Sequence, residues 1–212
     1  MKYKYILLDW DGNLAKTLDI WLAAYKAVLD DRNIVKTDQE IAAGFGLLSK
    51  QMVDWGVKDI DAAMLQADTV AKRMLPSVEL YPDALFVLEN LHSNGHKLAL
   101  ITTSTHENVA HLLENHNIKQ LFDVIIAGDD TTNHKPHPEP LELALKHLGG
   151  NKEDAVMIGD SDKDLGAAKN AGVDSVLFYP DEHKKFYSLD NLKEYSPTHI
   201  VSDFRKILEI AA

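Results

Sequence analysis

The stretch YILLDWDGNLAK, residues 5–16, decides how the chain is interpreted. Its apolar start predicts a short buried strand, which ends at Asp9 and Asp11 and is followed by Gly12. Parallel sheets bind ligands beyond the carboxyl ends of their strands, so we expect both acids at the edge of a site. Two neighbouring carboxylates cost free energy unless a cation or a shared proton compensates them. Taken alone, the stretch is equally compatible with a polar turn that caps a strand.

The composition is that of an ordinary soluble globular protein. The 212 residues, 45% hydrophobic and 26% charged, are enough for one good-sized core. The formal net charge of -11 disfavours nucleic acid and anionic membranes as partners. There is no cysteine, which excludes disulfides, thiolate metal ligands and a cysteine nucleophile. Because we find neither a signal-peptide pattern nor an apolar segment long enough to span a bilayer, we expect a cytoplasmic protein.

Residues 17–78 carry only helical patterns. Apolar residues recur at helical spacing between Leu18 and Leu29, and residues 37–40, TDQE, have the form of a capping box. Helical stripes continue after the interruption at residues 44–46 and end at Pro76. We therefore predict an all-helical segment without strands.

The rest of the chain alternates between strand and helix patterns. The predicted strands are residues 97–101, 124–127, 155–158, 175–179 and an edge strand at 199–201, and the predicted helices are residues 82–94, 107–115, 138–148, 163–171 and 204–210. Residues 181–196 are polar, and we expect a surface loop with little regular structure. The alternation indicates an α/β fold, a Rossmann-like parallel sheet with helices on both faces. We predict a core domain of residues 1–16 and 80–212, interrupted by a helical domain of residues 17–79.

Polar groups follow the predicted strands where each one ends. Residues 102–104, TTS, offer hydroxyls and backbone amides that suit an anion or simply cap a helix. Lys135 follows the third strand beside prolines, although an isolated lysine is most often solvated. Asp160 and Asp164 belong to an acidic cluster that helix capping alone hardly explains. Oxygen ligands without cysteine suit Mg²⁺, and the whole set suits phosphoryl transfer.

With these residues in view, the sequence resembles the haloacid dehalogenase superfamily, in its helical-cap branch of phosphoglycolate phosphatases and β-phosphoglucomutases. The matching residues are Asp9-Trp10-Asp11-Gly12, Thr102, Lys135-Pro136, and Gly159-Asp160-Ser161 with Asp164. They occur in the family's order, and the alternating pattern around them covers nearly the whole chain. Each motif alone is weak, whereas four in order are specific. The second aspartate favours phosphate chemistry, because the dehalogenases that named the family lack it.

The resemblance implies a Mg²⁺-dependent phosphatase that hydrolyses a small phosphorylated metabolite through an aspartyl-phosphate. Asp9 would be the nucleophile, and Asp11 would protonate the leaving oxygen and then activate water. Thr102 would bind the phosphoryl oxygens, and Lys135 would neutralise their charge. One residue departs from the family pattern: Asn13 stands where Thr is usual, and we expect altered tuning without loss of activity.

The resemblance also implies the metal ligands and a cap. Mg²⁺ would be held by Asp9, the backbone carbonyl of Asp11 and Asp160, with Asp164 in support through a water molecule. The helical segment stands where the family has its cap, which would close over the site and select the substrate. Further residues assigned to phosphate or substrate are Gly12, Thr103 and Lys50, and the cap loop at Gly44-Phe45-Gly46 and Ser49 is a candidate contact. His134 and His137 are expected on the surface, and Trp21 and Trp55 in the core.

Other functions stay open at this point. A sugar-phosphate mutase of the same branch would need a cap cation for a second phosphate, and Lys50 is the candidate. A phosphonate hydrolase would need an imine-forming cap lysine, and none stands out. A receiver-type signalling domain distributes its acids differently and has no insert of this size, and a silent relative would not need every matched residue. The sequence does not decide the substrate, the extent of cap motion, or between a monomer and a homodimer.

Overall fold

The computed structural model describes the backbone of residues 1–212 and the side chains of all of them except Leu48. Six strands form one parallel sheet in the order β3-β2-β1-β4-β5-β6. The strands are β1 (Tyr5–Leu8), β2 (Lys97–Ile101), β3 (Val124–Ile126), β4 (Ala155–Gly159), β5 (Asp174–Phe178) and β6 (His199–Val201). The fold class predicted from the sequence, a Rossmann-like α/β sheet, is confirmed.

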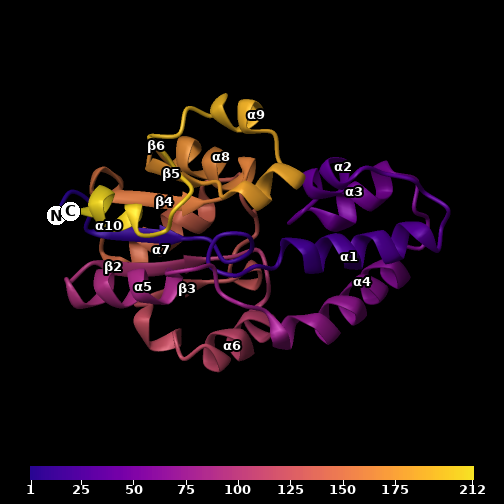
Figure 1. Ribbon diagram of the computed structural model, residues 1–212, viewed down its shortest axis with the longest axis horizontal. Helices are drawn as coiled ribbons and strands as arrows, with labels where there is room; N and C mark the ends of the chain where they lie inside the picture. The colour runs from indigo at the N-terminus through magenta and orange to yellow at the C-terminus, as the bar shows by residue number, and fades with distance from the viewer.

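Helices cover both faces of the sheet (Figure 1). In the α/β part they are α5 (Ala84–Ser93), α6 (His106–Asn115), α7 (Glu139–Leu148), α8 (Asp162–Ala171), α9 (Leu189–Lys193) and α10 (Lys206–Ala211), and short 3₁₀ turns occur in several of the connections. Successive residues of β1 point to opposite faces: Ile6 and Leu8 pack in the larger core cluster, whereas Tyr5 and Leu7 pack with α7 and α8 in the smaller one. The alternation explains why every residue of β1 is apolar, because both faces of a covered sheet are buried.

The chain order reverses beside β1, which lies between β2 and β4. Leu8, the last residue of β1, is level with Leu100 of β2 and with Ile158 of β4. Ligands of open parallel sheets bind at such a switch point, beyond the carboxyl ends of the strands. The fold therefore directs attention to the residues that follow β1 and β4.

The helical insert lies beyond this end of the sheet (Figure 1). It consists of α1 (Leu18–Asp30), α2 (Asp38–Ala43), α3 (Leu48–Asp54), α4 (Ile60–Met74) and the 3₁₀ turn η1 (Leu75–Ser77). The predicted capping box is present, since the Thr37 hydroxyl accepts from the backbone N–H of Glu40 and the Glu40 carboxylate accepts from that of Thr37. The division into a core and a cap domain at residues 17 and 79 stays a prediction.

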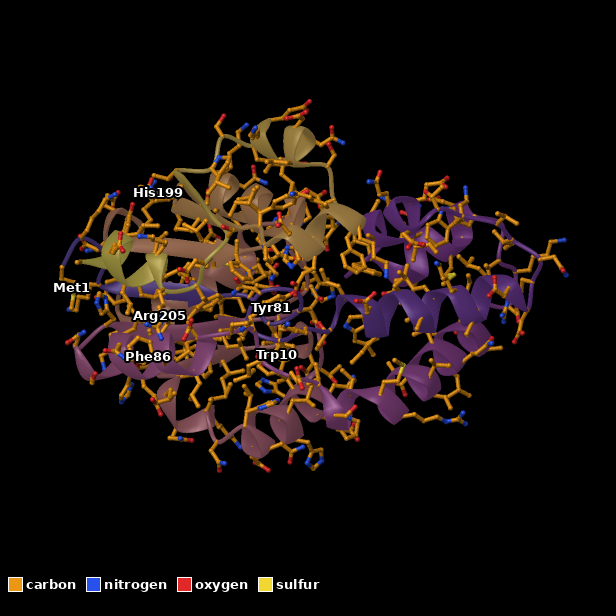
Figure 2. The ribbon with its side chains drawn as sticks, viewed as in Figure 1. Met1, Trp10, Tyr81, Phe86, His199 and Arg205 are labelled. Atoms are coloured by element: carbon orange, nitrogen blue, oxygen red, sulfur yellow. The ribbon has the colours of Figure 1, made fainter. Side chains whose placement is uncertain are left out.

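The two connections between the insert and the sheet run side by side. The backbone N–H of Lys16 donates to the carbonyl of Glu79 at 2.9 Å, and that of Tyr81 donates to the carbonyl of Leu14 at 2.9 Å. Figure 2 shows Tyr81 and Trp10 near this junction, toward the end of the sheet that faces the insert. The insert thus enters and leaves the α/β part through one paired segment.

Two expectations were wrong in detail. Helix α5 begins at Ala84 and not at residue 82, because Asp83 adopts the left-handed conformation with φ of 63°. The segment 181–196 is more than a polar surface loop: it contains the 3₁₀ helix η5 (Asp181–Lys185) and α9, and it buries Phe186 and Tyr187 against the core. Within the described residues, no helix is both long and apolar enough to cross a membrane.

Candidate active site

A cavity of about 380 Å³ lies between the carboxyl end of the sheet and the helical insert. Asp9 and Asp11 follow β1, Asp160 follows β4, and their side chains line it together. Lys135, Asp164, Thr103 and Lys50 line it as well, so the fold brings most of the predicted site residues to one place. Thr102 and Gly12 are not among the described residues that line the cavity.

Lys135 is buried and joins two carboxylates. Its Nζ donates to Asp9 Oδ1 at 2.5 Å, to Asp164 Oδ1 at 2.7 Å and to the backbone carbonyl of Ile101 at 2.9 Å. All three ammonium protons have acceptors, so the lysine is held in one position and is not a solvated surface group. Burial alone would lower the pKa of Lys135, but the carboxylates of Asp164 and Asp9 raise it above its usual value, and the side chain stays charged.

Asp9 carries an excess of surrounding negative charge. Burial raises the pKa of Asp9 well above its usual value, the Asp164 carboxylate adds to the rise, and Lys135 opposes it. Its backbone is held by Asn13, whose Nδ2 donates to the carbonyl of Asp9 at 3.0 Å. The residue that departs from the family pattern is thus fully buried and supports the turn, as the amide of an Asn allows.

Asp160 has a buried oxygen that lacks a partner. Its Oδ2 accepts no hydrogen bond from any described residue. Burial and the carboxylates of Asp164 and Asp9 raise the pKa of Asp160 well above its usual value. Gly12 makes the arrangement possible, because its φ of 76° suits glycine and a Cβ atom there would collide with the Asp160 carboxylate.

A cation would compensate this charge. Oxygens of Asp9, Asp160 and Asp164 lie within 4.8 Å of one another, a spacing that could hold a metal ion. An unpartnered buried carboxylate oxygen in an all-oxygen group is what a hard cation requires. Asp164 is the least available of the three, because its Oδ2 already accepts from the backbone N–H and the hydroxyl of Ser161.

Asp11 is held by the insert. The indole Nε1 of Trp21 donates to Asp11 Oδ1 at 2.7 Å, and the hydroxyl of Ser104 lies 3.5 Å from Oδ2. Burial raises the pKa of Asp11, and polar contacts with Thr17 and then Trp21, the Lys135 charge and Ser104 oppose the rise. Trp21, which we expected in the core, packs against it while only partly buried, and its side chain also lines the cavity.

The segment after β2 meets the insert loop. Thr102 is buried, and its hydroxyl accepts from the backbone N–H of Ser104 at 3.1 Å. Thr103 reaches the cavity and lies under Gly46, where a Cβ atom would touch its side chain. The loop at residues 44–46 therefore packs on the phosphate-binding segment that the sequence predicted. Lys50 also faces the cavity from α3.

Sequence reasoning named Phe45 as a candidate contact but missed the aromatic wall to which it belongs. Phe45 of the insert packs between Tyr25 and Phe186, with ring centroids 5.3 Å and 6.3 Å away, and Tyr187 lines the cavity beside it. Lys163 was also missed: its buried side chain donates from Nζ to the backbone carbonyl of Ala43 at 2.9 Å. The aromatic residues at 186 and 187 were a usable signal, but the charged residues around them suggested a loop.

Known proteins resemble the chain over most of its length. Residues 6–178 match the family model described as haloacid dehalogenase-like hydrolase. A pyrophosphatase PpaX from Bacillus mycoides is 28% identical over 93% of this chain and 97% of its own. A phosphoglycolate phosphatase from Salmonella typhi is 35% identical over 74% of this chain and 64% of its own.

A solved structure resembles the whole fold. A protein from Bacteroides fragilis described as a haloacid dehalogenase-like hydrolase superposes with a TM-score of 0.85 at 28% identity, covering 97% of this chain and 100% of that one. With the family model matched over residues 6–178, the resemblance seen in the motifs is confirmed. The chain belongs to the haloacid dehalogenase-like hydrolase family and is an enzyme of its phosphatase type.

Proposed function

We propose that the protein is a Mg²⁺-dependent phosphatase that hydrolyses a small phosphorylated metabolite through an aspartyl-phosphate on Asp9. The observation that supports this most is the buried Lys135 ammonium on Asp9, next to the unpartnered oxygen of Asp160. One lysine offsets part of the charge of four clustered acids, and the rest suits a divalent cation. Asp9, Asp160 and the carbonyl of Asp11 would hold it, with Asp164 behind them.

The reaction has two steps. In the first, an Asp9 carboxylate oxygen bonds to phosphorus, the bond to the leaving oxygen breaks, and the Asp11 carboxyl gives that oxygen its proton. In the second, the Asp11 carboxylate takes a proton from a water molecule, which bonds to phosphorus and releases Asp9 and inorganic phosphate. Lys135 and the backbone of residues 102–104 offset the charge on the phosphoryl oxygens. Bound Mg²⁺ supplies further charge neutralisation at the phosphoryl group.

Residues 17–79 act as a cap in this proposal. Trp21, Phe45 and Lys50 of the insert line the cavity. The Lys163 ammonium of α8 donates to the backbone carbonyl of Ala43 and so links the insert to the core. A closed cap excludes water during phosphoryl transfer and surrounds the leaving group. The insert thus selects the substrate, whereas the strand ends perform the chemistry.

The substrate class is a small phosphorylated metabolite, in the manner of phosphoglycolate phosphatase. Two relatives are named for phosphoglycolate and pyrophosphate hydrolysis, and both substrates belong in a test panel. Lys50 favours a second anionic group on the substrate, because it faces the cavity from the insert. A mutase would use the same lysine for the second phosphate of a sugar bisphosphate, so a sugar phosphate with and without a bisphosphate primer completes the panel.

The experiment is phosphate release by wild-type protein and the Asp9→Asn variant, with Mg²⁺ and with a chelator. We expect the variant to fall below about one thousandth of wild-type activity, and chelation to stop the reaction. Asp190→Asn, which changes an exposed carboxylate that does not line the cavity, should leave activity unchanged. Near-full activity of the Asp9 variant would show that another group is the nucleophile.

A further inference from the structure

Asp11 receives its one short side-chain hydrogen bond from outside the α/β core, among the described residues. Trp21 Nε1 lies 2.7 Å from Oδ1, whereas the Ser104 hydroxyl is 3.5 Å from Oδ2, at the limit of a hydrogen bond. Trp21 lies in the first turn of α1, and its backbone N–H donates to the carbonyl of Thr17 at 3.0 Å. The group that must carry protons is therefore oriented by the insert.

The indole ring is itself held in place. Tyr25, one helical turn later, is buried and packs against the Trp21 ring with centroids 6.3 Å apart. Phe45 packs edge-on against Tyr25 at 5.3 Å. A donor whose rotamer is fixed by packing can fix the orientation of its acceptor.

The chemistry of the indole determines which oxygen it leaves free. An indole N–H can only donate, so Oδ1 of Asp11 must accept. The position on Oδ1 that faces Trp21 is therefore closed to the acid proton of Asp11. The proton of a neutral Asp11 then resides on Oδ2. An acid whose proton is fixed on one oxygen presents it in a single direction, which proton transfer to a leaving oxygen requires.

We propose that Trp21 is a positioning residue for the reaction. Its hydrogen bond occupies Oδ1 of Asp11 and leaves Oδ2 as the oxygen that transfers the proton. The proposal rests on the proposed function of Asp11 as general acid. It goes beyond that function because Asp11 would be oriented to donate its proton only when α1 places Trp21 within hydrogen-bond distance of it. Cap position and proton transfer are thereby coupled through one hydrogen bond, and a substrate that keeps the insert in place also aligns the acid.

The test uses two aryl esters that differ in their need for an acid. 2,4-Dinitrophenyl phosphate releases a stable anion, whereas phenyl phosphate needs a proton on its leaving oxygen. We expect Trp21→Phe to lower kcat/KM for phenyl phosphate about tenfold and for the dinitrophenyl ester by less than about twofold. The value of kcat/KM reports the first chemical step, so the later use of Asp11 with water does not enter.

Three further variants make the result specific. Trp55→Phe removes an indole that packs outside the cavity and should change neither ester. Trp21→His retains a ring N–H and should recover part of the phenyl phosphate rate. In an Asp11→Asn background, Trp21→Phe should have no further selective effect on phenyl phosphate.

Each outcome has one meaning. An equal loss on both esters, or a rise in KM with kcat unchanged, would show that Trp21 contributes to binding or folding and would overturn the proposal. An unchanged rate on phenyl phosphate would overturn it as well. If wild-type protein cleaved neither ester with Mg²⁺, nor any member of the metabolite panel, the proposed function itself would fail, which is a different result.

Discussion

Two regions meet at the cavity and are built on opposite principles. The core edge carries buried charge: Asp9 and Asp160 directly follow β1 and β4, and Lys135 lies in the segment between β3 and α7. The other wall carries aromatic rings: Phe45 of the insert and Tyr187 line the cavity, and Phe186 packs against Phe45. The core edge holds charges that cost stability and suit one reaction, whereas the wall is ordinary apolar packing that tolerates change. Under the proposed function, the core edge would perform the chemistry and the wall would contribute to substrate selection.

The largest effect should follow from removing the positive charge of Lys135 at the core edge. Lys135→Met keeps the length of the side chain but leaves Asp9 and the phosphoryl group without their buried counter-charge. We expect phosphate release to fall about 10³-fold at saturating Mg²⁺. Lys169→Met, an exposed lysine of α8, is the matched control. A loss of less than tenfold would mean that charge at the core edge is not what drives the reaction.

The next effect concerns Asp160, whose substitution should impair activity without lowering the stability of the metal-free protein. Asp160→Asn removes one of the proposed metal ligands, and we expect the Mg²⁺ concentration for half-maximal activity to rise about 100-fold. The same change removes a buried charge among like charges, so the thermal unfolding temperature in chelator should rise or stay level. Activity against Mg²⁺ concentration and thermal unfolding with chelator measure the two effects. A variant less stable than wild type in chelator would show that the Asp160 charge is not a cost.

The smallest effect tests the wall. His183 of η5 is fully buried within hydrogen-bond distance of the Tyr81 hydroxyl, at 2.8 Å from Nε2, and burial lowers its pKa from 6.5 to about 4. The unfolded chain takes up the proton below pH 6.5, but the folded one does so only near pH 4. The free energy of unfolding should therefore fall as the pH falls, by about 2 kcal/mol from this group between pH 6.5 and 4.5.

His183→Phe should remove this part of the pH dependence. Denaturant unfolding at pH 6.5 and 4.5 gives the difference, with wild type as reference. Tyr81→Phe keeps the titrating ring and should keep the slope, although both variants lose the hydrogen bond. If the free energy of unfolding fell equally for the His183 variant and wild type over this range, the buried His183 would not be held neutral in the folded protein.

The core edge was largely predictable from the sequence. Asp9, Lys135 and Asp160 follow apolar runs, and parallel strands place their carboxyl ends together whatever the details of packing. The order of the strands around β1, however, depends on long-range pairing that a local pattern does not contain.

The wall was not predictable in the same way. Residues 181–187, DEHKKFY, have the composition of a loop, and only the folded chain shows that Phe186 and Tyr187 turn inward. Trp21 fitted a helical apolar stripe, so its ring was assigned to a core; whether an indole N–H meets a carboxylate depends on where α1 stands. Asp83 shows the same limit locally, because its left-handed backbone delays α5 by two residues.

The paired connections at residues 14–16 and 79–81 bear on how the insert could be replaced during evolution. The insert departs and returns at points joined by backbone hydrogen bonds, so an insert of another length could begin and end there without moving the strands. Joining Lys16 to Glu79 by a tight turn would leave β1 and β2 as the neighbours they already are. Under the proposed function, a different insert at these points would bring different substrates, and it would have to supply its own donor to Asp11 in place of Trp21.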